Sequence, residues 1–229
     1  MSQNGFFAKA LRFIGIVLMA LTAGFTLLGG VGTTCAALFP VKWEAMAPLA
    51  PFQWLYILFV LTGVAIGIAG IRATVLLVKG APQAYRDTLY TLVAGVVIGG
   101  IHIFVSRALR GKSMPVDAVV YTTALTLIIF LLIRIPVIWQ GVDFARTRST
   151  GNRTGGAAAI VVGIFTLFIQ YFMAPTHTWN GINYADAFHV SMSITGAVLM
   201  LGGLVLVWAP WNTKWLAIRQ SGVNLLKQA

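Results

Sequence analysis

The sequence is short of charge, and of negative charge above all. Only 9% of its 229 residues are charged, and only 5 of them are Asp or Glu. Soluble domains carry about 25% charged residues, so a chain this poor in charge cannot cover a surface that faces water. This excludes a soluble globular enzyme, a nucleic-acid-binding domain and a disordered region. The 16 Lys and Arg residues give a net charge of +11. They are scattered between apolar runs and form no basic stripe, so no nucleic acid is expected as a partner.

Paired cysteines and catalytic motifs are also missing. The single cysteine, Cys35, excludes an intrachain disulfide. The sequence holds no GxxxxGK[ST] loop, no HExxH and no CxxC. Ser193 stands in Met-Ser-Ile-Thr-Gly and therefore lacks the Gly-x-Ser-x-Gly elbow of a serine hydrolase. With so few acidic groups for proton transfer, we predict that the chain is not an enzyme.

Long apolar runs are what the sequence has in abundance. Hydrophobic residues make up 59% of the chain, and the mean hydropathy is +0.87. A helix needs about 20 mainly apolar residues to cross a bilayer. Six windows satisfy this length: 11–39, 53–79, 87–108, 116–140, 157–175 and 187–209. We therefore predict an all-α, polytopic integral membrane bundle with six transmembrane helices, forming one domain over residues 1–210. The first window is longer than needed, and Gly29-Gly30 is its expected breaking point.

The distribution of positive charge predicts the orientation of the chain. Ten of the 16 Lys and Arg residues fall in segments on the side of the N-terminus, and four fall on the opposite side. The positive-inside rule then places both termini in the cytoplasm, in an inner or plasma membrane. The 107–115 loop opposes the rule with Arg107, Arg110 and Lys112, so its side of the membrane stays open.

The C-terminal segment 211–229 has the composition of an amphipathic helix at a membrane surface. Its large apolar residues fall close to one helical face, and its basic residues are available to lipid headgroups. These residues are Trp211, Trp215, Ile218 and Leu225, with Lys214, Arg219 and Lys227. We predict an interfacial tail; a docking surface for a soluble partner is the alternative.

Histidine and glycine share one face on two of the predicted spans. The third window carries Gly95, Gly99 and His102 at helical spacing, and the sixth carries His189 and Gly196. The two spans run in opposite directions, which puts both histidines at a similar depth. Two opposed histidines beside glycines suit a bis-histidine haem b, and one histidine alone suits the magnesium of a chlorophyll-type pigment. Ordinary helix packing and a polar translocation path are the alternatives.

A second group of possible ligands precedes the sixth span. His177, Asp186 and His189 have side chains able to bind zinc or copper, but their spacing is unspecific and neither Cys nor Glu completes a site. We therefore predict no metal site and keep these three residues only as weak candidates.

Two arginines fall inside predicted spans. Arg72 and Arg134 each stand about seven residues from the end of a window, a distance over which an arginine can snorkel to the headgroups. Alternatively, both bind one anionic lipid headgroup or an anionic substrate. Asp87 and Asp143 lie near the same ends and are possible ion-pair partners.

Two functions fit this pattern. The first is a non-catalytic integral subunit of a larger membrane complex, in electron transfer or photosynthesis, with other membrane subunits and anionic lipids as partners. The second is a small-solute transporter, or its substrate-binding membrane component, with Arg72 and Arg134 as an anion-binding pair. A central cavity bearing these arginines would favour transport, and a solid bundle with an apolar exterior would favour the subunit.

Overall fold

A computed structural model shows a helical protein, with six helices among its described residues that are long and apolar enough to cross a membrane. The chain is therefore a multi-pass membrane protein, as its composition predicts. The structure describes residues 4–42, 44–113, 115–142, 144, 151–179, 181–183, 186 and 188–226. Within these ranges, the side chains of residues 4, 5, 45, 151, 173, 175–177, 179, 182 and 209–226 are not described.

The chain divides into two compact units, Met1–Arg146 and Thr147–Ala229, which are described separately. The predicted single domain over 1–210 stays a prediction. Unit 1 consists of these elements: α1 (Asn4–Gly32), α2 (Thr34–Leu38), η1 (Pro40–Lys42), η2 (Glu44–Phe52), α3 (Gln53–Lys79), α4 (Ala84–Arg110), α5 (Val116–Ile133) and α6 (Pro136–Val142). Unit 2 consists of α7 (Gly151–His177), the short strands β1 (Thr178–Trp179) and β2 (Ile182–Asn183), and α8 (His189–Leu226).

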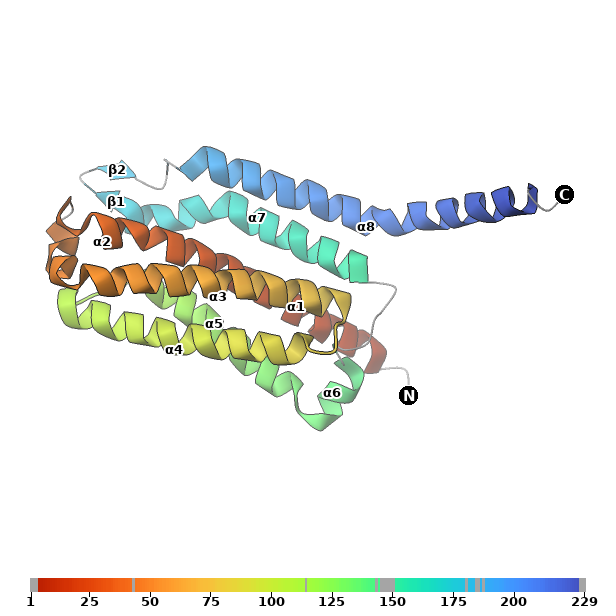
Figure 1. Cartoon of the computed structure of the whole chain (residues 1–229), viewed down its shortest axis with the longest axis horizontal. Helices are drawn as coiled ribbons and strands as arrows, with labels where there is room; N and C mark the ends of the chain where they lie inside the picture. Colours follow the sequence, from red (N-terminus) through yellow and green to blue (C-terminus); the bar gives the residue numbers. More distant parts are fainter. Residues whose placement is uncertain are drawn as a thin grey trace. The chain divides into compact units, whose positions relative to one another are not determined.

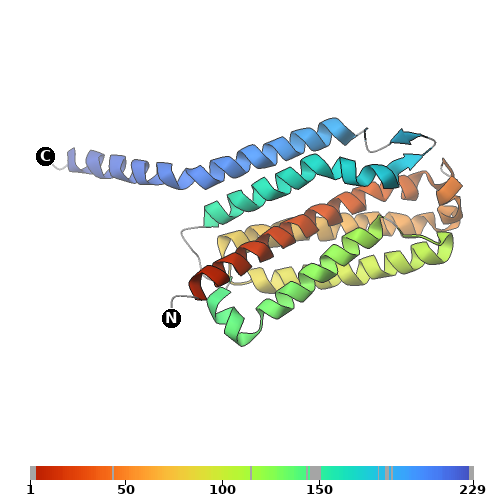
Figure 2. The ribbon, with the colours of Figure 1, turned by 180° about the vertical axis from the view of Figure 1, so that it is seen from behind.

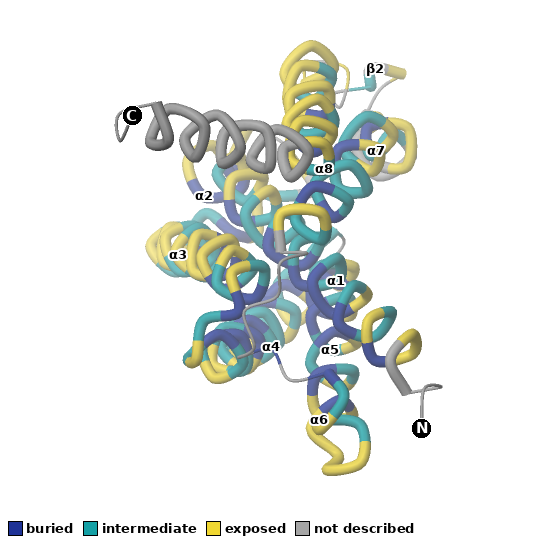
Figure 3. Tube along the Cα trace, turned by 90° about the vertical axis from the view of Figure 1, so that its right-hand side faces the viewer, coloured by how far each residue is buried: buried dark blue, intermediate teal, exposed yellow. Residues whose placement is uncertain are grey.

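The four long helices of unit 1 form a ring in which α1 contacts α3, α3 contacts α4, α4 contacts α5, and α5 contacts α1. Helices α3 and α4 lie in front in Figure 1, and α1 and α5 face the viewer in Figure 2. The view in Figure 3 shows exposed residues on the outward side of α3. We call the end that carries α2, η1 and η2 the α2 end, and the opposite end the α6 end.

Glycines end two of the long helices. Gly80 follows α3 with φ 70°, and Gly111 follows α4 with φ 71°. Only glycine adopts this left-handed conformation without strain, and it ends a helix by turning the chain away from the axis. Both turns reverse the chain, so that successive long helices run antiparallel.

The predicted break of the first span at Gly29-Gly30 is wrong. Helix α1 continues to Gly32, and the irregular residue is Thr33. Gly30 is a packing residue, because a Cβ there would lie 2.8 Å from the backbone nitrogen of Val64 on α3. Its missing side chain lets two helix backbones touch, which stabilises the span instead of interrupting it.

The fourth predicted window, 116–140, also needs correction. Helix α5 ends at Ile133, and a separate short helix begins at Pro136. Proline has no N–H to donate and disfavours the helical conformation of the residue before it. The helix therefore ends just ahead of Pro136, and Arg134 lies at the end of the span, not within it.

The two helices of unit 2 meet through glycines. A Cβ on Gly156 would lie 2.5 Å from the carbonyl oxygen of Gly203, and one on Gly163 would lie 2.8 Å from that of Gly196. Both pairs repeat after seven residues, so one continuous seam joins α7 to α8. Helix α8 continues to Leu226. The side chains of the predicted interfacial tail lie outside the described residues, and the tail stays a prediction.

Candidate functional site

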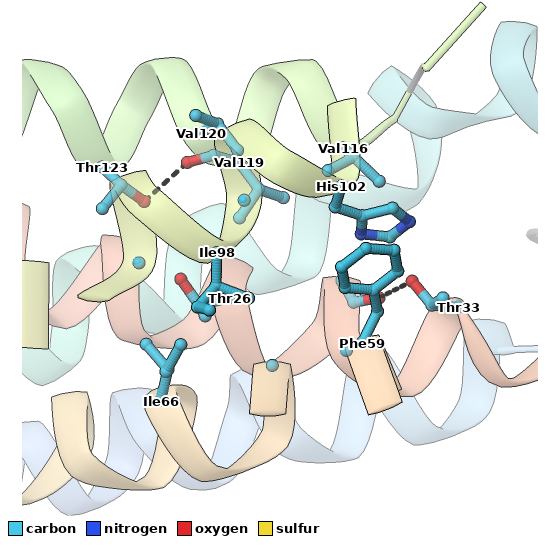
Figure 4. Close-up of a pocket in the computed structure, with 15 residues that line it drawn as sticks. Thr26, Thr33, Phe59, Ile66, Ile98, His102, Val116, Val119, Val120 and Thr123 are labelled. Atoms are coloured by element: carbon cyan, nitrogen blue, oxygen red, sulfur yellow. Dashed lines mark hydrogen bonds between the residues drawn. The ribbon is translucent and has the colours of Figure 1, made fainter. Parts of the chain in front are cut away.

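A small cavity lies between the four long helices of unit 1 (Figure 4). Its volume is ≈ 50 Å³. The residues that line it fall in the stretches 26–33 of α1, 59–66 of α3, 95–102 of α4 and 116–123 of α5. Since a helix rises 1.5 Å per residue, each stretch spans about 10 Å. The cavity is therefore narrow and runs along the helices.

The described lining of this cavity is uncharged but not wholly apolar. It includes the hydroxyls of Thr26, Thr33 and Thr123 and the imidazole of His102. Thr33 donates its hydroxyl proton to the carbonyl of Gly29 at 2.7 Å, and Thr123 donates to that of Val119 at 2.7 Å. Both hydroxyl oxygens can still accept hydrogen bonds from a further group.

His102 is held between aromatic rings. Its imidazole stacks on Phe59, with ring centroids 4.3 Å apart, and meets Tyr56 edge-on at 5.4 Å. The Tyr56 hydroxyl is in turn 2.8 Å from Ser106 Oγ, which joins α3 to α4. His102 is only 8% exposed. Among the residues that the structure describes, the imidazole has no hydrogen-bond partner.

The surroundings of His102 do not fit a tetrapyrrole. Gly95 and Gly99 were expected to leave room for a macrocycle, but α5 occupies that room. The side chain of Val120 packs directly on Gly99, and a Cβ on Gly95 would lie 3.1 Å from Thr123 Cγ2. Ligand pockets measure about 300–1,000 Å³, whereas this cavity measures ≈ 50 Å³. The cavity beside His102 is thus smaller than a haem or a chlorophyll needs, and the predicted tetrapyrrole contact stays a prediction.

Packed side chains lie at both ends of the cavity. Toward the α2 end they are the buried cluster of Ala36, Ala37, Leu49, Tyr56 and Phe59. Toward the α6 end the Thr22 and Thr126 hydroxyls meet at 2.8 Å. Beyond this pair come fully buried apolar side chains: Ile16, Met19, Leu77, Leu92, Phe130 and Ile133.

A polar network closes the α4–α5 turn at the α2 end. Arg107 donates from Nε to Ser113 Oγ at 2.9 Å and from a terminal nitrogen to Asp117 Oδ1 at 3.2 Å and Tyr121 at 3.3 Å. Asp117 also accepts a hydrogen bond from Ser113 Oγ at 2.7 Å and is 6% exposed. Its place in the first turn of α5 suits a carboxylate, because helix N-termini favour negative charge. The network gives Arg107, one of the cations that oppose the positive-inside rule, a structural role.

The two candidate anion-binding arginines have different partners. Arg72 is exposed and lies 4.0 Å from Asp87 Oδ2, so one predicted ion pair is present. The guanidinium carbon of Arg134 lies 4.5 Å from the ring centroid of Trp139 and 5.7 Å from that of Tyr85. These contacts do not join the two arginines. The other possible partner, Asp143, lies outside the described residues.

Arg12 is buried within unit 1, which no pattern in the sequence indicated. This arginine donates to the carbonyl of Leu77 at 2.9 Å, and its guanidinium carbon lies 5.4 Å from the centroid of the Phe144 ring. Its position in an apolar N-terminal run predicted a cytoplasmic charge. The contact instead ties α1 to the end of α3.

In unit 2, His189 is oriented by a glutamine that the sequence did not single out. His189 Nδ1 lies 2.8 Å from Gln170 Oε1, and Gln170 Nε2 donates to the carbonyl of Leu167 at 3.3 Å. With the amide nitrogen bonded to Leu167, its oxygen accepts from Nδ1, which leaves the lone pair of the imidazole on Nε2. A histidine held in this way has the arrangement of a metal ligand. Its predicted neighbour Gly196 packs against Gly163 and Leu167, which leaves little room for a macrocycle there.

No described group of three His, Cys, Asp or Glu residues could hold a metal ion. The side chain of His177 lies outside the described residues, and Asp186 Oδ1 accepts a hydrogen bond from Asn183 at 2.9 Å. His102 and His189 belong to different units. Their joint ligation of one haem stays a prediction that the cavity beside His102 does not favour.

Comparison with known proteins does not assign the chain to a family. Neither a protein-family model, nor a curated protein, nor a solved structure matches this chain. The functional argument rests on the residues and their contacts.

Proposed function

We propose that the chain is a non-catalytic integral subunit of a larger membrane protein complex. The observation that carries the proposal is the packed interior of unit 1. Its central cavity of ≈ 50 Å³ is too small for a metabolite, and none of the residues described as lining it is charged. A transporter that recognises an anion through Arg72 and Arg134 would need them at its binding site, and neither lines this cavity.

The exterior of α8 supports contact with another membrane chain. Six of its exposed apolar residues repeat at intervals of three or four, which places these six on one face of the helix. They are Val190, Ile194, Val198, Leu201, Val205 and Trp208; Leu204 and Leu206 are exposed as well but are less so than these six. This spacing is that of a helix-packing seam and suits a second transmembrane helix.

We further propose that both termini are cytoplasmic and that the membrane is an inner or plasma membrane, on the evidence of the charge distribution. Exposed Arg72, Arg86 and Arg134 on unit 1 would then meet anionic headgroups of the cytoplasmic leaflet. If the complex carries a pigment or haem, His189 Nε2 is the group in this chain best arranged to contact it.

The experiment is gentle solubilisation from the native membrane, followed by a native gel and a visible absorption spectrum. We expect the chain to migrate with other membrane proteins, and Leu201→Trp on the α8 face to release it. Leu61→Trp on α3 is the matched control, because Leu61 and Leu201 are 62% and 63% exposed. A chain that migrates alone in both wild-type and variant form would contradict the proposal.

Small-solute transport is the second candidate, because the unit 1 cavity carries four polar side chains within an apolar bundle. Liposomes that contain the purified chain alone would distinguish the two functions in an osmotic swelling assay with small uncharged solutes. Swelling that Thr123→Val abolishes would favour transport, and its absence would favour the subunit.

A further inference from the structure

We propose that the cavity of unit 1 is a binding site for a short file of water molecules, anchored by the imidazole of His102. The site would place ordered water inside the membrane-spanning part of the chain. The inference holds whether the chain acts as a subunit or as a transporter.

The first argument is the buried imidazole itself. His102 is 8% exposed, lines the cavity and has no hydrogen-bond partner among the described residues. A polar group inside the protein without a hydrogen-bond partner destabilises the fold. Neither nitrogen of His102 is among the fully enclosed atoms without a partner in the described part of the chain, so a water-sized probe reaches both. Its aromatic neighbours Phe59 and Tyr56 contact the imidazole through their rings and cannot satisfy its nitrogens. Water in the cavity would remove this destabilisation.

The second argument is size. A cavity holds one water molecule when the space open to the centre of a water-sized sphere is about 10–15 Å³. At ≈ 50 Å³, the cavity has room for about three water molecules. Its length of about 10 Å along the helices suits a single file.

The third argument is the placement of the other polar groups. Figure 4 shows Thr33 close to His102 and Phe59 at one end of the cavity, with Thr26 and Thr123 farther along it. Buried water makes about three hydrogen bonds, to protein or to further water. The oxygens of Thr33 and Thr123 can accept from water, since their own protons go to backbone carbonyls. A file of water would link the imidazole at one end to the hydroxyls at the other.

Other occupants fit less well. An ion would lie among uncharged side chains in the membrane interior, where an isolated charge is costly. An organic molecule of metabolite size is too large for the ≈ 50 Å³ cavity. Cavities that stay empty are lined by apolar groups, and such cavities bind xenon.

The test uses the full chain with ¹⁵N-labelled histidine in lipid bilayers. Water-edited solid-state NMR measures how fast magnetisation passes from water to each imidazole, and His102→Phe assigns the His102 signal. We expect the His102 signal to grow as fast as that of exposed His189. A His102 signal that grows several times more slowly than that of His189 would overturn the proposal.

Xenon binding provides an independent measurement. We expect no xenon in the wild-type cavity, because water occupies it, and xenon binding in His102→Phe, because the cavity loses the imidazole that anchors the water. Xenon binding to the wild-type protein would show a dry cavity and overturn the proposal. A tightly bound organic molecule in the mass spectrum of the intact protein, lost in His102→Phe, would also overturn it.

A matched glycine pair on α4 tests the location. Gly95→Ala would place a methyl group 3.1 Å from Thr123 Cγ2, within the cavity lining, whereas a Cβ on Gly100 meets nothing within 4 Å. We expect Gly95→Ala to slow the transfer from water to His102 at least two-fold and Gly100→Ala to leave it unchanged. Equal rates in both variants would place the water elsewhere and contradict the proposal.

Discussion

The hydroxyls of Thr22 on α1 and Thr126 on α5 lie 2.8 Å apart, although 104 positions separate them in the sequence. Thr126 donates its own proton to the carbonyl of Thr122 at 2.8 Å, so Thr22 is the donor of the pair. This hydrogen bond joins two helices in the apolar interior of unit 1. It also separates the polar cavity from the apolar side chains of the α6 end.

Removing this hydrogen bond should destabilise unit 1 by a small and measurable amount. Hydrogen bonds between membrane helices contribute about 0.6 kcal/mol on average. We expect Thr22→Val and Thr126→Val to show a coupling free energy of about that size in a double-mutant cycle of unfolding in mixed detergent micelles. Two strictly additive substitutions would mean that the hydroxyls do not interact.

The glycine seam of unit 2 predicts a larger effect. Gly156→Leu should force α7 and α8 apart, because even a Cβ at that position would lie 2.5 Å from the Gly203 carbonyl oxygen. Overpacking of this kind costs about 1–3 kcal/mol, measurable as a lower midpoint of thermal unfolding in detergent. Gly202→Leu is the control, since a Cβ there meets nothing within 4 Å. A similar loss in both variants would argue against the seam.

The buried carboxylate of Asp117 should contribute more to stability than the partly exposed carboxylate of Asp87. Asp117 accepts hydrogen bonds from Ser113 and Arg107, and Asp117→Ala removes the carboxylate to which both of them donate. We expect a loss of about 1–3 kcal/mol in unfolding free energy. Asp87→Ala, which breaks the 4.0 Å contact with Arg72, should cost at most about 1 kcal/mol. The reverse order would contradict the assigned network.

The arginines at the α6 end should determine lipid selectivity. Each basic residue near an anionic surface contributes about 1 kcal/mol, so Arg72→Ala with Arg134→Ala should reduce bound anionic lipid by about ten-fold or more. Mass spectrometry of the intact protein in mixed anionic and zwitterionic lipid measures the change. Lys112→Ala, at the α2 end, is the control and should retain the anionic lipid. An unchanged lipid profile in the double variant would contradict this prediction. The two arginines would then reach the headgroups by snorkelling without selecting anionic lipid.

The spans could be predicted because length and apolarity alone determine whether a helix crosses a bilayer. The predicted window 53–79 coincides with α3, since Gly80 and Pro82 mark its end in the sequence. The predicted window 116–140 is too long for an equally local reason, because Pro136 lies within this apolar run and the helix ends before it. Local signals are thus enough to give the helices and most of their ends.

The contacts between helices could not be predicted, because they depend on how each helix is rotated about its axis. The spacing of Gly95, Gly99 and His102 predicts that they share one face of α4. It does not identify the helix that packs against this face. The face meets α5, whose Val120 occupies the space assigned to a macrocycle. Gln170 was missed for the same reason, since it lies 19 positions from the histidine that it orients.

The glycine seam also has a consequence for the order of synthesis. The contacts of the seam lie between 156 and 203, so the two helices of unit 2 become able to pair only after residue 203 has left the ribosome, when the first 146 residues have already left it. They then need no group from the first 146 residues to recognise each other. Such a hairpin can enter the bilayer as a preassembled pair, because each helix satisfies its own backbone hydrogen bonds and the seam supplies the contact between the two.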